Sequence, residues 1–386
     1  MTTRERRIPI HSTPLQGKMA SKSPIWACKP RTEAKLKILS HYLGAWFSIL
    51  AVKQFRQVYY IDGFCGPGEY TSGEQGSPVI PARMASSTAQ KYPGFKAKLI
   101  FVDEDPDAIE HLNSIKAIRK QHPSVSIDIK VGKFSDQIKS IVSELKQNPQ
   151  CPTFSFIDPF GFGSSPFDKL SRLMHNDHSE LMINFMCGYM NRFKEHPDAS
   201  VTDKIRNMVG QEDLQAIISS SDSIDAICDA FEKNLHSVGR YILKFMMRDE
   251  GNTRDNAFFF CGRQSRGFEK IKEAMWKVDP IHGNSFSAHR VNSDNPLQER
   301  LFQDEPDTHQ LSKLIAEKFG NRENVAVKKI FDWVVKETET FLKPHARTEL
   351  ENLYEHGFIT RVLDPQPRNR KRAKKHWPER LLLTFK

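Results

Sequence analysis

Apolar and polar positions along the first half of the chain predict strands and helices in regular succession. Residues 32–54 carry apolar side chains at helical spacing, which predicts a helix. Five strand-like segments follow: QVYYIDGFCGPG, KAKLIFVDED, VSIDIKVG, TFSFIDPFG and ELMINFM. Helical patterns separate them, at 77–91, from 106, at 135–147 and at 166–175. Strands that alternate with helices favour a parallel, doubly wound sheet.

The next segment predicts a change of strand direction. After a polar helical stretch at 202–237, residues 241–263 contain two apolar runs joined by the polar loop 249–256. A β-hairpin that closes an otherwise parallel sheet is the arrangement of class I S-adenosylmethionine (SAM) methyltransferases. The predicted fold class is therefore α/β, with a Rossmann-like class I methyltransferase sheet that is parallel and ends in an antiparallel hairpin.

The pattern changes again past residue 295. Helical patterns run over 307–319, 324–341 and 344–356, and two short strands, GFITRVLD and RLLLTF, flank the basic run RNRKRAKK. Three helices followed by a two-stranded wing predict a winged-helix-like domain with a basic wing. We therefore expect three parts: a flexible basic arm at 1–25, a methyltransferase-like domain at 26–294 and a winged-helix-like domain at 295–386.

Length and charge support this division. A chain of 386 residues is long for one domain. The formal net charge is +10, and residues 1–31 carry seven Lys or Arg against one Glu, while residues 361–386 carry nine against two acids. The body between them is therefore slightly acidic. Basic ends suit contact with phosphates, although ordinary solvated tails have the same composition.

Composition also bears on location and metal content. No apolar stretch approaches the ~18–20 residues that span a bilayer, and the N-terminus lacks the apolar core of a secretory signal. The six cysteines are scattered without CxxC pairs. This predicts reduced thiols in a cytoplasmic protein, with no membrane segment and no metal site.

Three carboxylates follow predicted strands, at the sheet edge where open parallel sheets bind ligands. They are Asp62, Asp103 and Asp158. After Asp62 the glycines of D-G-F-C-G-P-G, namely Gly63, Gly66 and Gly68, let the backbone approach a ligand closely. An ordinary turn explains a lone glycine loop equally well.

The second carboxylate, Asp103, suits the two ribose hydroxyls of a nucleoside cofactor. Capping of the following helix by Asp105 is the alternative use of this acidic cluster. Phe134, after the third strand, is a candidate for contact with the adenine. Cys65 lies in the glycine loop and could be a nucleophile, but a small buried thiol is the simpler interpretation.

Asp158, Pro159 and Phe160 form the candidate catalytic group. A carboxylate only accepts hydrogen bonds, so Asp158 suits a substrate amino group. Pro159 has a rigid φ that aims a neighbouring carbonyl, and Phe160 offers a face for a stacked base. Together they would hold a planar amine toward a methyl donor. A simple turn at the end of a strand is the alternative.

Several motifs resemble those of the three-Cys-motif partner family over most of residues 26–290. They are WACKPRTEAKLKILSHYLGAW, YIDGFCGPG, GSP, DPFG and AMWKVDP, in this order. The family resembles SAM-dependent methyltransferases, and the likeness implies a radical-SAM-like partner protein with three cysteines. DPFG followed by Ser-Pro also resembles a motif of the tRNA guanine-N2 dimethyltransferases. Here Phe162 and Gly163 precede the serines, so that match is local.

The leading hypothesis is a SAM-dependent N-methyltransferase that acts on an exocyclic amine of a nucleobase in nucleic acid. The basic wing would contact the nucleic acid through Arg368, Arg370, Lys371, Arg372, Lys374 and Lys375. One alternative is methylation of a small molecule or peptide together with the three-Cys-motif partner. Another is a non-catalytic DNA-binding regulator with a SAM-sensing domain.

Overall fold

The computed structural model describes residues 25–161, 163–248, 254–288, 305–362 and 377–386. Among them, no helix is both long and apolar enough to cross a membrane. The six basic residues predicted for the wing lie outside the described residues, as does almost all of the predicted N-terminal arm.

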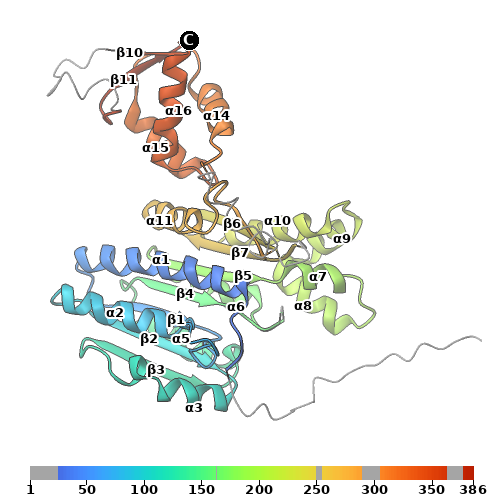
Figure 1. The fold of residues 1–386 in the computed structure, drawn as a ribbon. Helices are drawn as coiled ribbons and strands as arrows, with labels where there is room; N and C mark the ends of the chain where they lie inside the picture. Colours follow the sequence, from blue (N-terminus) through green and yellow to red (C-terminus); the bar gives the residue numbers. More distant parts are fainter. Residues whose placement is uncertain (1–24, 162, 249–253, 289–304, 363–376) are drawn as a thin grey trace, which may run out of the picture.

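An eight-stranded sheet forms the centre of the larger unit, in the order β3-β2-β1-β4-β5-β7-β6-β8 (Figure 1). The strands are β1 Val58–Asp62, β2 Ala97–Asp103, β3 Val125–Val131, β4 Thr153–Ile157, β5 Ser179–Phe185, β6 Tyr241–Arg248, β7 Arg254–Gly262 and β8 Ser285–Ser287. The first five run parallel, and β7 is antiparallel to both β5 and β6. This confirms the predicted fold class. The short strand β8 extends the sheet beyond the predicted hairpin.

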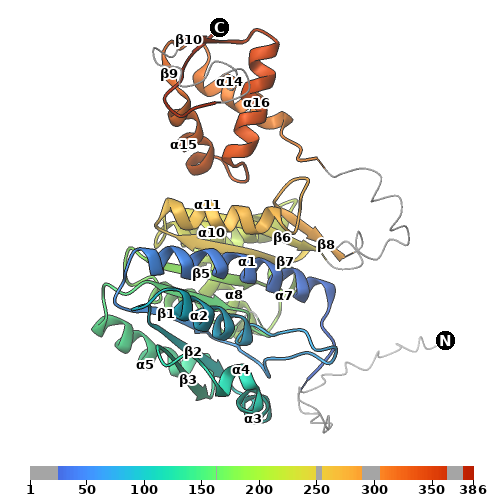
Figure 2. The ribbon, with the colours of Figure 1, turned by 60° about the vertical axis from the view of Figure 1, so that its left-hand side comes forward.

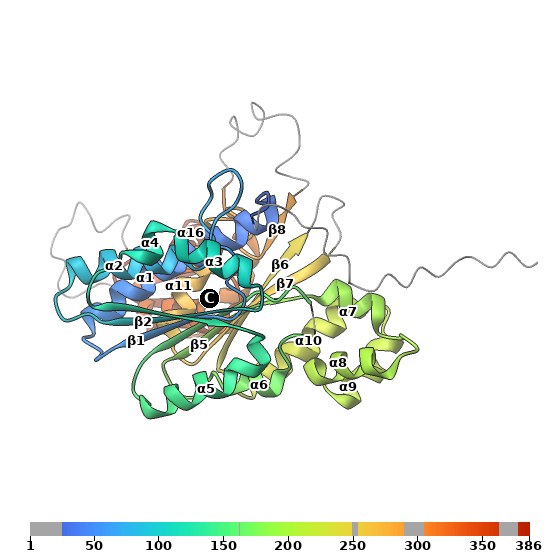
Figure 3. The same cartoon turned by 90° about the horizontal axis from the view of Figure 1, so that it is seen from below.

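Helices cover both faces of the sheet, as Figure 3 shows from below. One face packs against α1 Pro30–Val52, α2 Val79–Lys91, α3 Pro106–Ser114, α4 Lys116–Arg119 and α11 Ser265–Trp276. The other packs against α5 Phe134–Gln147, α6 Phe167–Ser171, α7 Cys187–Phe193, α8 Ala199–Val209, α9 Gln211–Ser219 and α10 Ser223–His236. Because β1, β4 and β5 are buried on both faces, their sequences are nearly continuous apolar runs.

A smaller unit with its own apolar core follows (Figure 2). It contains helices α14 His309–Phe319, α15 Val327–Glu337 and α16 Lys343–Glu355, and strands β9 Val325–Ala326, β10 Ile359–Val362 and β11 Leu382–Phe385. The strands form an antiparallel sheet in the order β10-β11-β9. Three helices and a hairpin were predicted here, and β9 is an addition. The identity of the unit as a winged helix stays a prediction.

Helix α11 holds the smaller unit through a buried lysine. The Lys272 side chain is 1% exposed, and its Nζ donates to the carbonyl oxygens of Val335, at 2.9 Å, and of Thr338. Its ammonium also lies 4.2 Å from the centre of the Phe268 ring. One helical turn further on, Trp276 Nε1 donates to the carbonyl of Thr340 at 2.8 Å. The two units therefore share a polar contact that is removed from water.

We predict that Lys272→Met loosens this contact, because buried carbonyls lose their donor. The free energy of unfolding should fall by about 1–3 kcal/mol in urea denaturation, and limited proteolysis should cleave between the units sooner. Lys270→Met is the matched control, because Lys270 lies on the same helix and pairs with Glu273. Equal losses in the two variants would contradict a specific role for Lys272.

Candidate functional site

A cavity of about 220 Å³ opens at the edge of the sheet where the parallel strands end. Helix α1, the loop after β1, and residues near the ends of β4, β5 and β7 line it. Its polar and glycine lining includes Arg31, Lys35, Gly66, Gly68, Asp158, Asn184 and Asn256. The parallel direction of β1, β4 and β5 explains why residues so far apart in sequence meet here.

Asp103 holds the glycine loop in place. Its Oδ2 accepts from the amide of Gly66 at 2.8 Å, and its Oδ1 accepts from the amide of Asp105 at 2.9 Å. Gly66 and Gly68 have φ values of +59° and +86°, which favour glycine. A Cβ at Gly68 would also lie 2.7 Å from Leu112. Asp105 caps α3 by accepting from the amide of Asp107, as the alternative use of this acidic cluster required. Binding of ribose by Asp103 stays a prediction.

Asp62 lies fully buried at the start of the glycine loop. Its Oδ1 accepts from the amide of Phe64 at 3.2 Å, and its Oδ2 has no hydrogen-bond partner among the described residues. Burial raises the pKa of Asp62 from 3.8 to about 7, and the carboxylates of Asp158 and Asp103 add to this rise. The hydroxyl of Ser77, which lines the cavity, interacts with this carboxyl and opposes the rise of its pKa, whereas Asp62 itself does not line the cavity.

Asp158 follows β4 directly and is held from two sides. Its Oδ1 accepts from Nδ2 of Asn184 at 2.7 Å, and its Oδ2 forms an ion pair with Lys35 of α1. The side chain of Lys35 is 10% exposed and that of Asp158 is 23% exposed, so the pair is largely shielded from water. The carboxylate is thus fixed in orientation at the cavity wall.

Aromatic rings surround the same cavity. Phe160 is 71% exposed, the largest exposed fraction among the large apolar side chains that the structure describes. The ring of Trp26 lies 6.3 Å from that of Phe160 and 6.2 Å from that of Tyr70, both in edge-on geometry. All three rings line the cavity, together with the buried Pro159. A planar ligand would find apolar surface here.

Of the other predicted residues, Cys65 lines this cavity, whereas Asp62, Gly63, Asp103 and Phe134 lie outside its lining. Phe134 is 2% exposed and contacts the ring of Phe64, with ring centres 5.6 Å apart. A Cβ at Gly63 would lie 3.0 Å from both Phe134 and Ile157, so this glycine allows close packing. Cys65 is buried, and burial raises the pKa of its thiol, which disfavours a reactive thiolate. Among the described residues, no group of side chains could hold a metal ion.

Sequence reasoning did not find Lys35, Asn184 and Asn256. Lys35 is separated from Asp158 by 123 residues, and the predicted helix around it gave no sign of its partner. Asn184 interrupts the apolar run LMINFM, and that break was the available signal. Asn256 was predicted to end the polar loop 249–256, whereas the structure places it in strand β7.

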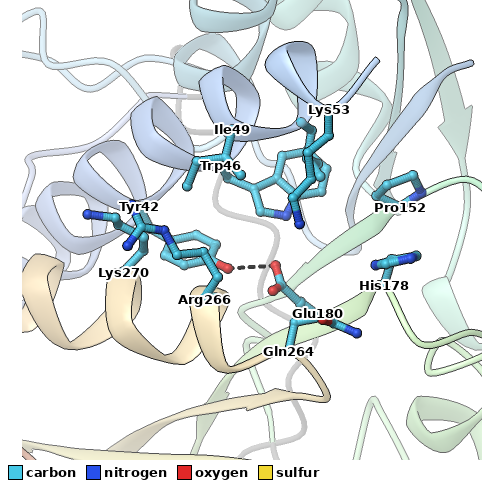
Figure 4. A pocket seen from close by; sticks show the side chains of 12 residues that line it. Tyr42, Trp46, Ile49, Lys53, Pro152, His178, Glu180, Gln264, Arg266 and Lys270 are labelled. Atoms are coloured by element: carbon cyan, nitrogen blue, oxygen red, sulfur yellow. Dashed lines mark hydrogen bonds between the residues drawn. The ribbon is translucent and has the colours of Figure 1, made fainter. Parts of the chain in front are cut away.

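A second cavity lies near the opposite edge of the sheet, where Pro152 precedes β4 and His178 precedes β5. Figure 4 shows Glu180 between Tyr42 and Gln264 in this cavity. The hydroxyl of Tyr42 donates to Oε2 of Glu180 at 2.5 Å. Burial raises the pKa of Glu180 from 4.5 to about 7.

Comparison with solved structures finds only weak similarity, in sequence and in three-dimensional structure. No family model and no curated protein matches the chain, so the resemblance to the three-Cys-motif partner family stays a prediction. Protein LPL1258 from Legionella pneumophila is 8% identical, with a TM-score of 0.38 over 63% of this chain and 90% of its own. An O-methyltransferase from Bacillus cereus, in complex with SAH, is 13% identical, with a TM-score of 0.30 over 57% and 80%. A geranyl diphosphate methyltransferase in complex with GPP and sinefungin is 11% identical, with a TM-score of 0.24 over 56% and 76%. Because these TM-scores are low, we base neither fold nor function on them.

We predict that Glu180→Gln changes how stability depends on pH. The folded protein keeps the Glu180 proton up to about pH 7, whereas the unfolded chain loses it near 4.5. Stability is therefore lost as the pH rises between these values. In the variant this part of the loss should disappear, so the free energy of unfolding in urea should fall less between pH 4.5 and pH 8 than in the wild type. The same fall in both proteins would contradict the raised pKa of Glu180.

Proposed function

We propose that this chain is a SAM-dependent N-methyltransferase that acts on an exocyclic amine of a nucleobase in nucleic acid. The observation that carries the proposal is the Asp158 carboxylate at the wall of a cavity that exposed aromatic rings surround. The carboxylate suits an amine, and the rings suit a planar base. The sheet order and the glycine loop are compatible with this activity.

The residues beside the cavity fit a nucleoside cofactor. Gly66 and Gly68 have backbone conformations that would let the chain approach a ligand closely. Oδ2 of the neighbouring Asp62 has no close hydrogen-bond partner among the residues that the structure describes, although the Ser77 hydroxyl interacts with this carboxyl. Asp103 fixes the loop through Gly66, and we propose that it also accepts from the ribose. When bound, SAM supplies a methyl group that is activated by the sulfonium centre.

Lys35 affects how an acceptor reaches Asp158. Asn184 binds Oδ1 and Lys35 binds Oδ2, and each carboxylate oxygen accepts more than one hydrogen bond, so an incoming amine would share Oδ2 with the ammonium. The amine would donate one N–H to the carboxylate and keep its lone pair free to accept the methyl group. On transfer, Asp158 would accept the amine proton, with S-adenosylhomocysteine as the leaving group. Asn184 stays bound throughout, so the carboxylate does not rotate. Catalysis of this kind relies on positioning.

The smaller unit would bind the nucleic acid. We propose that it is a winged helix and that the basic run 368–375 contacts phosphates. Support comes from the order of its helices and strands and from six basic residues within that run. Contacts with phosphates supply affinity without reading sequence.

We predict that Asp158→Ala and Asp103→Ala separate transfer from cofactor binding. Asp158→Ala should lower methyl transfer at least about 100-fold, with little change in SAM affinity. Asp103→Ala should weaken SAM binding about 10-fold or more, because the amide of Gly66 loses a charged acceptor. The measurements are calorimetry with SAM, and transfer of labelled methyl groups to RNA and to DNA from cells that lack the gene.

Asp168→Ala is the matched control, since Asp168 is an exposed acid on the nearby helix α6 and pairs with Arg172. Normal transfer by Asp158→Ala would contradict the assignment of the acceptor site. If the wild-type protein methylates neither RNA nor DNA, the proposed substrate class is contradicted.

A further prediction concerns the basic run. Replacing Arg368, Arg370, Lys371, Arg372, Lys374 and Lys375 with Gln should weaken nucleic-acid binding and flatten its dependence on salt. Substitution is preferable to truncation, because strand β11 follows this run and its Leu383 is fully buried. Nucleic-acid affinity measured over a range of salt concentrations tests this, and an unchanged salt slope would contradict it.

A further inference from the structure

A chain of hydrogen bonds links three neighbouring elements of the sheet at the cavity. Asn184 of β5 donates through Nδ2 to Asp158 at the end of β4, at 2.7 Å. Asn256 of β7 donates through Nδ2 to Oδ1 of Asn184, at 2.9 Å. All three residues line the cavity, and the two asparagines are each 4% exposed.

Asp158 determines which group donates and which accepts in each of these hydrogen bonds. Asp158 is paired with Lys35 and is therefore a carboxylate, which accepts hydrogen bonds and cannot donate them. Asn184 must then turn its amide nitrogen toward Asp158 and its oxygen toward Asn256. Asn256 must in turn present its nitrogen to Asn184. Both amide orientations thus depend on the charge of one acid.

Oδ1 of Asn256, the last atom in this series of hydrogen bonds, is buried and has no partner among the described residues. A buried acceptor left in this way costs about 1–3 kcal/mol. Rotating the amide would not help, because it would bring two oxygens together at Asn184. A donor supplied by a ligand in the cavity would satisfy it.

We propose that Asn256 is a specificity-determining residue whose Oδ1 accepts a hydrogen bond from the substrate. The inference rests on the proposed function and extends it: the substrate donates from its amine to Asp158 and from a second group to Asn256. Substrates with two donors on one edge are then preferred over substrates with a donor beside an acceptor. A site with a buried polar group rejects a ligand that leaves that group unpaired.

The test compares two nucleotides as probes in calorimetry, with S-adenosylhomocysteine present. Guanosine 5′-monophosphate has an amino group beside a ring N–H, whereas cytidine 5′-monophosphate has an amino group beside a ring acceptor. The wild-type protein should bind the first about 10-fold or more tightly than the second. In Asn256→Leu this ratio should fall toward one, while the affinity for S-adenosylhomocysteine stays the same.

Tyr60→Phe is the matched control. The hydroxyl of Tyr60 is another buried oxygen without a partner among the described residues, but Tyr60 does not line the cavity. The variant should keep the wild-type ratio. If Asn256→Leu does not fold, as its melting curve would show, Asn256→Ser makes the same test, since it keeps a donor for Asn184 and has a shorter side chain.

The possible outcomes separate the two hypotheses. A ratio that the Asn256 variants leave unchanged, or a wild-type protein that does not prefer the two-donor nucleotide, would overturn the role of Asn256 alone. Failure of both nucleotides to bind the wild-type protein would count against the proposed nucleobase substrate, and the role of Asn256 would fall with it.

Discussion

The charge of Asp158 is the constraint on which the site depends. It attracts Lys35 from α1 and orients Asn184, and through Asn184 it orients Asn256. A single acid thereby links a helix from the start of the chain to three adjacent strands. Parallel pairing makes this possible, because it brings the ends of β1, β4 and β5 to one edge of the sheet.

The two sides of the cavity differ in how they are held. On the side of β1 and β2, backbone amides of the glycine loop bind the carboxylates of Asp62 and Asp103. On the side of β5 and β7, side chains bind one another. Backbone hydrogen bonds change little when side chains are substituted, which suits a ligand that is always the same, such as a cofactor. Hydrogen bonds between side chains change with single substitutions, which suits a site whose substrate differs between related proteins. The proposed division into a cofactor side and an acceptor side agrees with this difference.

Much of the fold could be predicted from the sequence, and less of the site. Apolar runs and glycine turns indicated the strands, and β1 and β2 end at the predicted acids Asp62 and Asp103. The first helix was predicted at 32–54 and spans Pro30–Val52. Lys35, however, pairs with Asp158, which lies far from it in the sequence. The spacing of apolar residues predicts local elements and does not predict such a contact. Phe134 was predicted from its position after a strand, but the degree of its burial depends on packing against Phe64, which only the three-dimensional structure shows.

The lysine contact between the two units has an evolutionary consequence. Lys272 binds main-chain carbonyls of Val335 and Thr338, and every amino acid carries such a carbonyl. The side chains at those two positions can therefore be substituted without loss of the hydrogen bonds, as long as the local backbone conformation is kept. The lysine has less freedom, since a side chain that is shorter or lacks an N–H donor would leave the carbonyls unpaired. Selection should thus act more strongly on Lys272 than on the side chains at positions 335 and 338, so different C-terminal units could be exchanged on the same sheet.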